Sequence, residues 1–490
     1  MSVEGLIFLI YQVLVIAAII HVVMDNRQPA KTMAWALVIY FVPVVGIVAY
    51  LFFGVNTRKE RFVSRRSMDQ LTKRSMLEFV EQTNLRLPEQ HQALINLFVN
   101  QSFSLPFNNN SVQLLTNGYQ FFPALLRDIG RAQSHIHIDM YIFEDDPLGR
   151  LVADALMAKA QQGVEVRIAY DDVGCWSVKA PFFERMREAG IEVASFLPVR
   201  FPKFTSKVNY RNHRKLVVID GHTGYIGGMN IALRYVKGTS DGQPWRDTMA
   251  RIEGRGVFSL QRAFLVDWYF VDRTLLSNRK YYPTVMEPQR LNAEKATTPQ
   301  LQANAANTTL LQTVTSGPAM PYPEIMQGFV RMILAAKHYI YIETPYFLPT
   351  DAVLFALKTA AATGVDVRLL VPRRSDARIT DWASRSYLRE ACEAGISVLF
   401  YEDGFLHSKL MVCDDTVATC GSTNIDFRSF ENNFEANAFF YGEQTACQMR
   451  DIFLNDERTA TPITSLPERM SPRFHVRFCE SLARLFSPLL

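Results

Sequence analysis

Two short stretches of this sequence follow one pattern: His213-Arg-Lys215-Leu-Val-Val-Ile-Asp220 and His407-Ser-Lys409-Leu-Met-Val-Cys-Asp414. Each reads H-x-K-x4-D, and in each copy an asparagine lies 17 residues beyond the histidine, Asn230 in the first and Asn424 in the second. A single H-x-K is uninformative, whereas two copies with matching offsets indicate a duplication. The pattern therefore predicts a chain of two related halves.

Strand-like and helical segments recur in the same order before the two motifs. IHIDMYIF (136–143) leads through a helical stretch to GVEVRIAYDD (163–172), and YIYIETPYF (339–347) leads through another to GVDVRLLVP (364–372). Each helical stretch ends at a glycine, a favoured position after a helix, and β-branched residues follow. We therefore expect an α/β fold of two mixed-sheet domains related by a pseudo-two-fold duplication, at residues 111–290 and 310–490, with a polar linker at 291–309.

The motif places its chemical groups on one face of a strand. Residues i and i+2 project from the same side, so His213 and Lys215 can point at one ligand, as can His407 and Lys409. Two such faces together would surround a phosphodiester with two imidazoles, two ammonium groups and two carboxamides. That set supplies fixed positive charge, a nucleophile and a general acid.

The N-terminus concentrates the apolar residues. Residues 5–24 and 33–54 contain no Asp, Glu, Lys or Arg, and each run is long enough to cross a ~30 Å hydrocarbon layer as a helix. Pro43 lies inside the second run and predicts a kink there. We expect a transmembrane hairpin over residues 1–56, with helices at about 5–24 and 33–54.

Charge sets the expected orientation of that hairpin. Residues 58–74 carry a net charge of +5, which the positive-inside rule places in the cytoplasm. We expect residues 57–110 to be a basic juxtamembrane linker. The N-terminus and everything after the hairpin would then lie on the cytoplasmic side of a multi-pass membrane protein.

A second basic segment precedes the first motif. Residues 200–215 carry +6, so against a whole-chain charge of +4 the rest of the chain outside both basic segments sums to −7. Basic side chains interleaved with aromatic ones suit an anionic membrane surface. This predicts a collar that faces the membrane and gathers lipid headgroups, formed by Arg200, Lys203, Lys207 and Arg211; the alternative is a solvated loop with buried aromatic residues.

Three further features have weaker implications. Apolar residues at 474–486 share one helical face, which would either pack on the core or lie on a membrane. His135 and His137 share a strand face without acidic or cysteine partners in a metal spacing, and are expected to be structural. The six cysteines show no C-x-x-C spacing, which excludes a zinc ribbon and argues against a disulfide framework.

With its duplicated motif, the sequence resembles the phospholipase D superfamily, whose signature this is. Within that superfamily it is most similar to bacterial cardiolipin synthases of the membrane-anchored, two-motif type. The segments that carry this closer resemblance are KTMAWALVIYFVPVVGIVAYLFFG (31–54), DTMARIEG (247–254), TPYFLPTD (344–351), DWASRSY (381–387) and FSPLL (486–490). The resemblance implies two phospholipase D-like halves.

The resemblance also implies roles for the site residues. One histidine attacks phosphorus to give a phosphatidyl-histidine and the other serves as acid and base. Many members use the N-terminal motif for the nucleophile, which suggests His213 as the nucleophile and His407 as the acid/base; the near symmetry of the two motifs leaves the reverse assignment open. The groups expected to hold phosphate oxygens are Lys215, Lys409, Asn230, Asn424 and, unless its hydroxyl merely caps a turn, Ser422. Asp247 and Glu435 would orient the imidazoles, each from the opposite half. Asp220 and Asp414 belong to the signature and are expected to be structural rather than chemical.

The implied reaction converts two phosphatidylglycerol molecules into cardiolipin and glycerol. It exchanges one phosphodiester for another and so needs no nucleotide. In agreement, the sequence lacks both a G-x-x-x-x-G-K-[ST] loop and the D-G-x2-A-R pattern of enzymes that use CDP-alcohols. The expected partners are phosphatidylglycerol and an anionic bilayer, the bacterial cytoplasmic membrane, with no cofactor, metal or nucleic acid. The alternative is another phospholipase D-type phosphatidyltransferase or hydrolase, using phosphatidylethanolamine or water.

Overall fold

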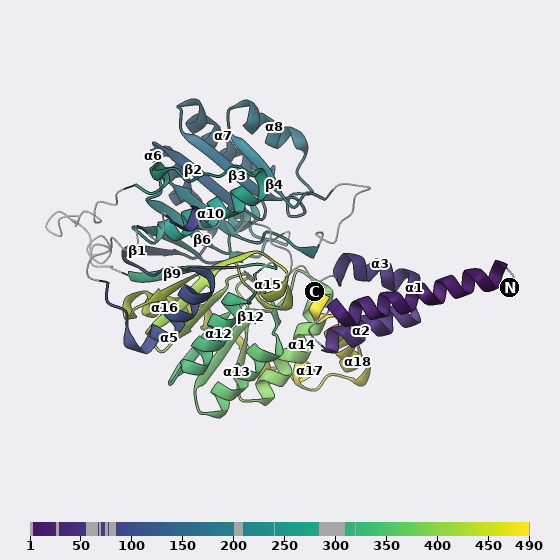
Figure 1. Cartoon of the computed structure of the whole chain (residues 1–490). Helices are drawn as coiled ribbons and strands as arrows, with labels where there is room; N and C mark the ends of the chain where they lie inside the picture. The colour runs from purple at the N-terminus through teal and green to yellow at the C-terminus, as the bar shows by residue number, and fades with distance from the viewer. Residues whose placement is uncertain are drawn as a thin grey trace.

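The structure is a computed structural model, shown in Figure 1. It describes residues 3–25, 29–54, 85–199, 209–239, 241–283, 309–318 and 320–489, together with residues 67, 70–73 and 77. Most of the basic segment 58–74, the collar positions 200–208 and most of the linker 291–309 lie outside the described residues.

One long mixed sheet runs through both halves, in the order β19-β13-β12-β10-β15-β16-β18-β9-β1-β8-β6-β5-β2-β3-β4. The first half contributes β1 (Phe107–Leu115), β2 (His135–Met140), β3 (Glu165–Asp171), β4 (Glu192–Phe196), β5 (Lys215–Ile219), β6 (Thr223–Gly227) and β8 (Met249–Glu253). The second contributes β9 (Thr309–Ser316), β10 (Tyr339–Glu343), β12 (Asp366–Pro372), β13 (Ser397–Tyr401), β15 (Leu410–Cys413), β16 (Val417–Gly421), β18 (Glu435–Tyr441) and β19 (Thr461–Pro462).

The strand order makes the duplication visible. Outward from the antiparallel contact between β1 and β9, the first half reads β1-β8-β6-β5-β2-β3-β4 and the second reads β9-β18-β16-β15-β10-β12-β13. In both halves the last three strands pair in parallel and the others are antiparallel. The predicted fold class, two related mixed-sheet α/β halves, is confirmed.

Helices cover both faces of the sheet (Figure 1). In the first half they are α6 (Gly118–Arg131), α7 (Pro147–Gln161), α8 (Ala180–Glu188) and α10 (Val257–Asp272), and in the second α12 (Glu324–Ala335), α13 (Asp351–Ala362), α14 (Arg378–Glu393) and α16 (Glu443–Glu457). Alternation along β5 explains the layering, because Val217 packs in the core of the first half whereas Leu216 and Val218 pack in a cluster shared by both halves. That shared cluster joins the halves into one body.

Residues before position 111 differ from the sequence expectation. Helix α5 (Gln92–Ser102) buries Ile95 and Phe98 in the core of the second half, and the Phe98 ring lies 4.5 Å from that of Phe439. Strand β1 then begins at Phe107. The expectation of a linker as far as residue 110 is therefore wrong for this stretch, because apolar positions of α5 face the second sheet.

The apolar N-terminus forms α1 (Val3–Asp25), α2 (Pro29–Phe41) and α3 (Pro43–Phe53). Of the described residues, only α1 is long and apolar enough to cross a membrane, over Glu4–Met24. The second expected span is divided at Val42, because Pro43 has no N–H to continue the helix and starts α3 instead. The three helices pack on one another around Val15, Val22, Ile39 and Tyr50.

Candidate active site

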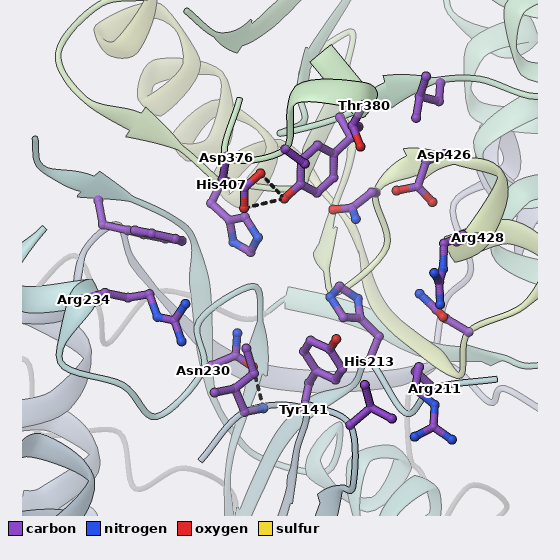
Figure 2. Close-up of a pocket in the computed structure, with 18 of the residues that line it drawn as sticks. Tyr141, Arg211, His213, Asn230, Arg234, Asp376, Thr380, His407, Asp426 and Arg428 are labelled. Carbon is purple, nitrogen blue, oxygen red and sulfur yellow. Dashed lines mark hydrogen bonds between the residues drawn. The ribbon is translucent and has the colours of Figure 1, made fainter. Parts of the chain in front are cut away.

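A cavity of about 660 Å³ lies between the halves, and both contribute side chains to it. His213 and Asn230 line it from the first half, and His407 and Asn424 from the second. Figure 2 shows both imidazoles pointing into the same space. The structure thus brings together the histidines and asparagines of two motifs that are almost 200 residues apart in sequence.

Backbone contacts across the halves fix each motif. The N–H of His213 donates to the carbonyl of Phe434 at 2.9 Å, and the N–H of His407 donates to the carbonyl of Arg246 at 2.7 Å. Phe434 and Arg246 each directly precede an acidic residue of the opposite half. The second contact extends a short parallel ladder between β14 (Phe405–Leu406) and β7 (Trp245–Arg246). A histidine and its acid are therefore positioned by the same pairing.

Each imidazole contacts a buried carboxylate from the other half. His213 Nδ1 lies 3.0 Å from a Glu435 oxygen, and His407 Nδ1 lies 2.7 Å from an Asp247 oxygen. Both acids are fully buried. A carboxylate partner favours the tautomer in which Nδ1 carries the proton, which leaves the Nε2 lone pair available in the cavity. The residues predicted to orient the histidines occupy the geometry that this role requires.

The electrostatic environment favours the neutral form of both imidazoles by lowering their pKa values. Burial lowers the pKa of His213 to about 4, against the opposing influence of Glu435. Burial and the nearby Lys409 ammonium lower the pKa of His407 to about 3. Burial alone would raise the pKa of Glu435, but His213 and Lys215 outweigh it and lower that pKa. A neutral imidazole beside an ionised acid is the form that a nucleophile needs.

The two lysines are buried beside the histidines. Each ammonium donates to the carbonyl of its own motif histidine, Lys215 to His213 and Lys409 to His407. Burial lowers the pKa of Lys215 to about 7 and that of Lys409 to about 8. A bound phosphate would favour the charged form of both, so the lysines are poised to gain charge as an anion enters.

The asparagines differ in their local bonding. The Asn230 carboxamide accepts from the N–H of Ile142 at 3.1 Å and donates to the Tyr235 hydroxyl at 2.8 Å. The side-chain oxygen of Asn424 is buried without a hydrogen-bond partner among the described residues. Both amides still face the cavity, and each retains a side-chain N–H for a phosphate oxygen.

Ser422 does not take the position expected for a phosphate ligand or for a turn cap. Its hydroxyl donates to the carboxylate of Glu435, and its oxygen accepts from the N–H of Ala436 at 3.0 Å. At the matched position Gly228, a Cβ would lie 2.1 Å from an Asp247 oxygen. The second half therefore holds Glu435 with the hydroxyl of Ser422. In the first half, Gly228 has no side chain and so leaves room for Asp247.

Asp220 and Asp414 lie outside the cavity, at the ends of β5 and β15. The Asp220 carboxylate accepts from the N–H groups of residues 133, 134 and 135 at 2.7–3.0 Å. Asp414 accepts from those of residues 337, 338 and 339 at 2.6–2.9 Å. Each aspartate has a positive φ and ties its turn to the start of a neighbouring strand. Both members of the signature therefore bond to backbone N–H groups rather than face the cavity.

Arg211 differs from the expectation of an exposed collar. It is 3% exposed, its guanidinium lies 3.4 Å from the Asp171 carboxylate, and it donates to the carbonyl of Leu197 at 3.1 Å. The apolar and acidic groups around it draw this residue into the cavity wall. Arg200, Lys203 and Lys207 lie outside the described residues. His135 and His137 are buried on Gln261 of α10, at 2.9 and 2.8 Å, with no metal-ligating cluster among the residues described.

Sequence reasoning missed two matched arginines in the cavity wall. Arg234 and Arg428 each lie four residues beyond a motif asparagine, an offset that a search for further repeated positions would have found. Figure 2 shows them on opposite sides of the histidine pair. Arg234 pairs with Glu144, whereas the contact of Arg428 is a 3.4 Å hydrogen bond to the carbonyl of Asn209. Tyr346, whose hydroxyl donates to Asp376 at 2.8 Å, was also missed.

Comparison with known proteins places the chain in a family. The family described as cardiolipin synthase, PLD-like domain, matches residues 125–242 and 329–457, which include both motifs, and a phospholipase D-nuclease N-terminal family matches residues 13–54. The chain is 36% identical to a cardiolipin synthase of Oceanobacillus iheyensis, over the full length of both. It belongs to the cardiolipin synthase family. Members of this family are membrane-associated phosphatidyltransferases of the phospholipase D superfamily, and their substrates are phospholipids.

Other similar proteins agree with this assignment to the cardiolipin synthase family. The chain is 35% identical to the major cardiolipin synthase of Bacillus subtilis over the full length of both proteins. It is 38% identical to a cardiolipin synthase of Geobacillus thermodenitrificans, covering 98% of this chain and 94% of that one. Among solved structures, a phosphatidylserine synthase of Haemophilus influenzae is similar in fold, with a TM-score of 0.58 and 14% identity over 86% of this chain and all of that one.

Proposed function

We propose that this protein transfers a phosphatidyl group from one phosphatidylglycerol molecule to a second, giving cardiolipin and glycerol. The observation that supports this most strongly is the pair of imidazoles that face one cavity, each held by an acid from the opposite half. A double displacement at phosphorus needs two such groups, one to form a covalent bond and one to move protons.

In the first step the Nε2 atom of His213 attacks phosphorus. The P–O bond to the headgroup glycerol breaks. His407, whose Nε2 takes up a proton when the phosphate anion binds, donates that proton to the departing alkoxide. The product is a phosphatidyl-histidine and free glycerol. Ammonium groups of Lys215 and Lys409 and carboxamides of Asn230 and Asn424 stabilise the charge that develops on the non-bridging phosphate oxygens.

In the second step the flow of protons reverses. His407, now neutral, takes the proton of a headgroup hydroxyl on a second phosphatidylglycerol, whose oxygen attacks phosphorus. The P–N bond to His213 breaks, and cardiolipin leaves. Since the acceptor carries its own phosphate, the site must hold a second anion, and the cavity wall offers Arg234 and Arg428 for it. The reaction breaks one phosphodiester bond and forms another, so it needs no nucleotide to drive it.

We propose that the apolar helices α1–α3 anchor the protein as a hairpin with both ends in the cytoplasm. The absence of charge in residues 5–24 and 33–54, and the net charge of +5 over residues 58–74, support this topology. An anchored body keeps the cavity close to lipids that never leave the bilayer. Cysteine accessibility on either side of the membrane, at position 26 and at the C-terminus, tests this orientation.

The deciding experiment gives the purified full-length protein vesicles in which phosphatidylglycerol is the sole reactive lipid. Cardiolipin and glycerol in equal amounts are expected. Phosphatidic acid as the sole product would make the protein a hydrolase and overturn the proposal. Adding phosphatidylethanolamine in a second arm shows whether the donor or acceptor headgroup is restricted to glycerol.

A further inference from the structure

The C-terminal helix α18 (Phe474–Leu485) is amphipathic, but its orientation is the reverse of an ordinary surface helix. Its polar side faces the protein: Glu480 is 2% exposed and accepts from Arg389 of α14 at 2.8 Å. Arg484 lies 2.7 Å from Glu390 and stacks over the Tyr387 ring at 4.0 Å. These contacts fix which side of the helix points outward.

The outward side carries five large apolar residues, with Ser481 exposed among them. Phe474 is 85% exposed, Phe478 59%, Leu482 47% and Leu485 74%, at the spacing of one helical face, and Phe486 follows at 50%. Ile379 and Trp382 of α14, the helix on which α18 packs, are exposed as well. Several large apolar side chains exposed on neighbouring helices of a folded protein mark a contact with another apolar phase or molecule.

Three observations favour a lipid surface as that contact. The basic residues Arg473 and Arg477 are exposed at the margin of this face, whereas Glu480, the acid of α18, is buried, which suits anionic headgroups. The chain also carries a candidate membrane-spanning helix, so its body already lies near a bilayer. Helices α1–α3 leave the face uncovered, although Figure 1 shows them toward the same end of the molecule.

The start of α14 also contributes to the wall of the active-site cavity. Ala377 and Thr380, at the start of α14, line the cavity, and Ile379 lies between them in sequence. An apolar surface beside the cavity would let acyl chains remain in the bilayer while the headgroup reaches the histidines.

We propose that α18 and the first turns of α14 seat directly on the surface of an anionic bilayer, as a membrane contact separate from the N-terminal helices. We call the residues Phe474, Phe478, Leu482, Leu485, Phe486, Ile379 and Trp382 the seating face. The contact sets the height of the cavity above the lipid. It does not depend on which phosphatidyl acceptor the enzyme uses.

Photo-crosslinking of the full-length protein in vesicles tests the contact without requiring turnover. Phosphatidylglycerol with a diazirine in one acyl chain is the probe, and adducts are mapped by peptide mass spectrometry. Adducts on peptides that contain residues 474–486 and 379–382 are expected. Adducts confined to residues 3–53, with none on peptides that contain α18, would overturn the proposal.

A matched pair of variants tests the consequence for catalysis. The triple variant Phe474→Ser, Phe478→Ser, Leu485→Ser should lose about tenfold or more in kcat/KM on vesicles and remain unchanged on a short-chain, water-soluble phosphatidylglycerol. Leu151→Ser, at a residue 51% exposed on α7 at the opposite end of the molecule, should match the wild type on both. Equal losses on both substrates would assign α18 a purely structural part and refute the seating face. If neither the wild type nor any variant forms cardiolipin, the proposed function is wrong. The crosslinking experiment still tests the membrane contact of α18 in that case.

Discussion

Glu435, which begins β18 of the second half, lies 3.0 Å from Nδ1 of His213 in the first half. Asp247 of the first half lies 2.7 Å from Nδ1 of His407 in the second half. Neither half therefore contains a complete histidine–acid pair of its own. The active site exists only where the two halves meet.

Replacing Glu435 by Gln should reduce kcat by about 10²–10⁴-fold, because an amide no longer stabilises the charge on His213 and can hold the wrong tautomer. Asp247→Asn should give a loss of the same order through His407. Turnover of phosphatidylglycerol is the measurement, with circular dichroism to verify folding. Glu443→Gln, at an exposed acid in the first turn of α16, is the control and should retain full activity. Full activity in either site variant would refute the assigned role.

The two histidines should be separable with a donor lipid whose leaving group needs no proton, such as phosphatidyl p-nitrophenol. With His407→Ala, p-nitrophenol should appear in a single burst, and a phosphatidyl adduct should accumulate on His213. With His213→Ala, neither burst nor adduct is expected. Mass spectrometry of acid-quenched peptides locates the adduct. An adduct on His407 in the His213 variant would reverse the assignment of nucleophile and acid/base.

The matched positions Gly228 and Ser422 should respond differently to alanine. A Cβ at Gly228 would lie 2.1 Å from Asp247 and push this acid away from His407, so Gly228→Ala should lower kcat by about 10²-fold or more. Ser422→Ala keeps the space and loses one hydrogen bond to Glu435, so the loss should be about tenfold. Steady-state kinetics with both proteins shown to be folded provide the comparison. Equal losses of kcat in the two variants would contradict the different roles assigned to Gly228 and Ser422.

The pH profile of kcat/KM should be bell-shaped. On the acid side, activity falls as pH drops through about 4, where His213 takes up a proton and loses its lone pair. On the alkaline side, it falls as pH rises, because His407 must gain a proton when the phosphate binds and because Lys215 and Lys409, with pKa values of about 7 and 8, lose their charge. Because a bound phosphate raises both lysine pKa values, kcat at saturating lipid should persist to higher pH than kcat/KM. If kcat and kcat/KM fell at the same alkaline pH, phosphate binding would not raise the lysine pKa values, and the prediction would be wrong.

Asp220→Ala and Asp414→Ala should destabilise the fold without impairing the chemistry of the molecules that remain folded. Each substitution leaves three backbone N–H groups without their carboxylate, at a cost of about 2 kcal/mol in the free energy of unfolding. Denaturant titration measures that cost. Activity per folded molecule should match the wild type, and a loss beyond tenfold at full folding would return these aspartates to the reaction.

The repeated motif was sufficient to predict the duplication, the mixed sheets and the residues that face one another across the cavity, because offsets between chemical groups survive in sequence. It could not show that Arg211 turns inward to Asp171, since burial of a cation depends on a partner 40 residues away. Helix α5 was missed for a related reason, as its apolar face matches a sheet more than 200 residues later. Ser422 was misplaced because its hydroxyl meets Glu435, a contact set by side-chain rotamers rather than by spacing.

The crossed acids also constrain how such a chain arose. A single copy of the half-unit would hold a histidine whose carboxylate has to come from another molecule, so an unfused ancestor could work only as a symmetric pair, with two chains sharing one reaction centre. With both copies in one chain, the two partners need not be identical. One half holds a glutamate with a hydroxyl, and the other holds an aspartate against a bare backbone. Because the donor and acceptor lipids have different roles in the reaction, the two sides of the cavity can differ to suit them.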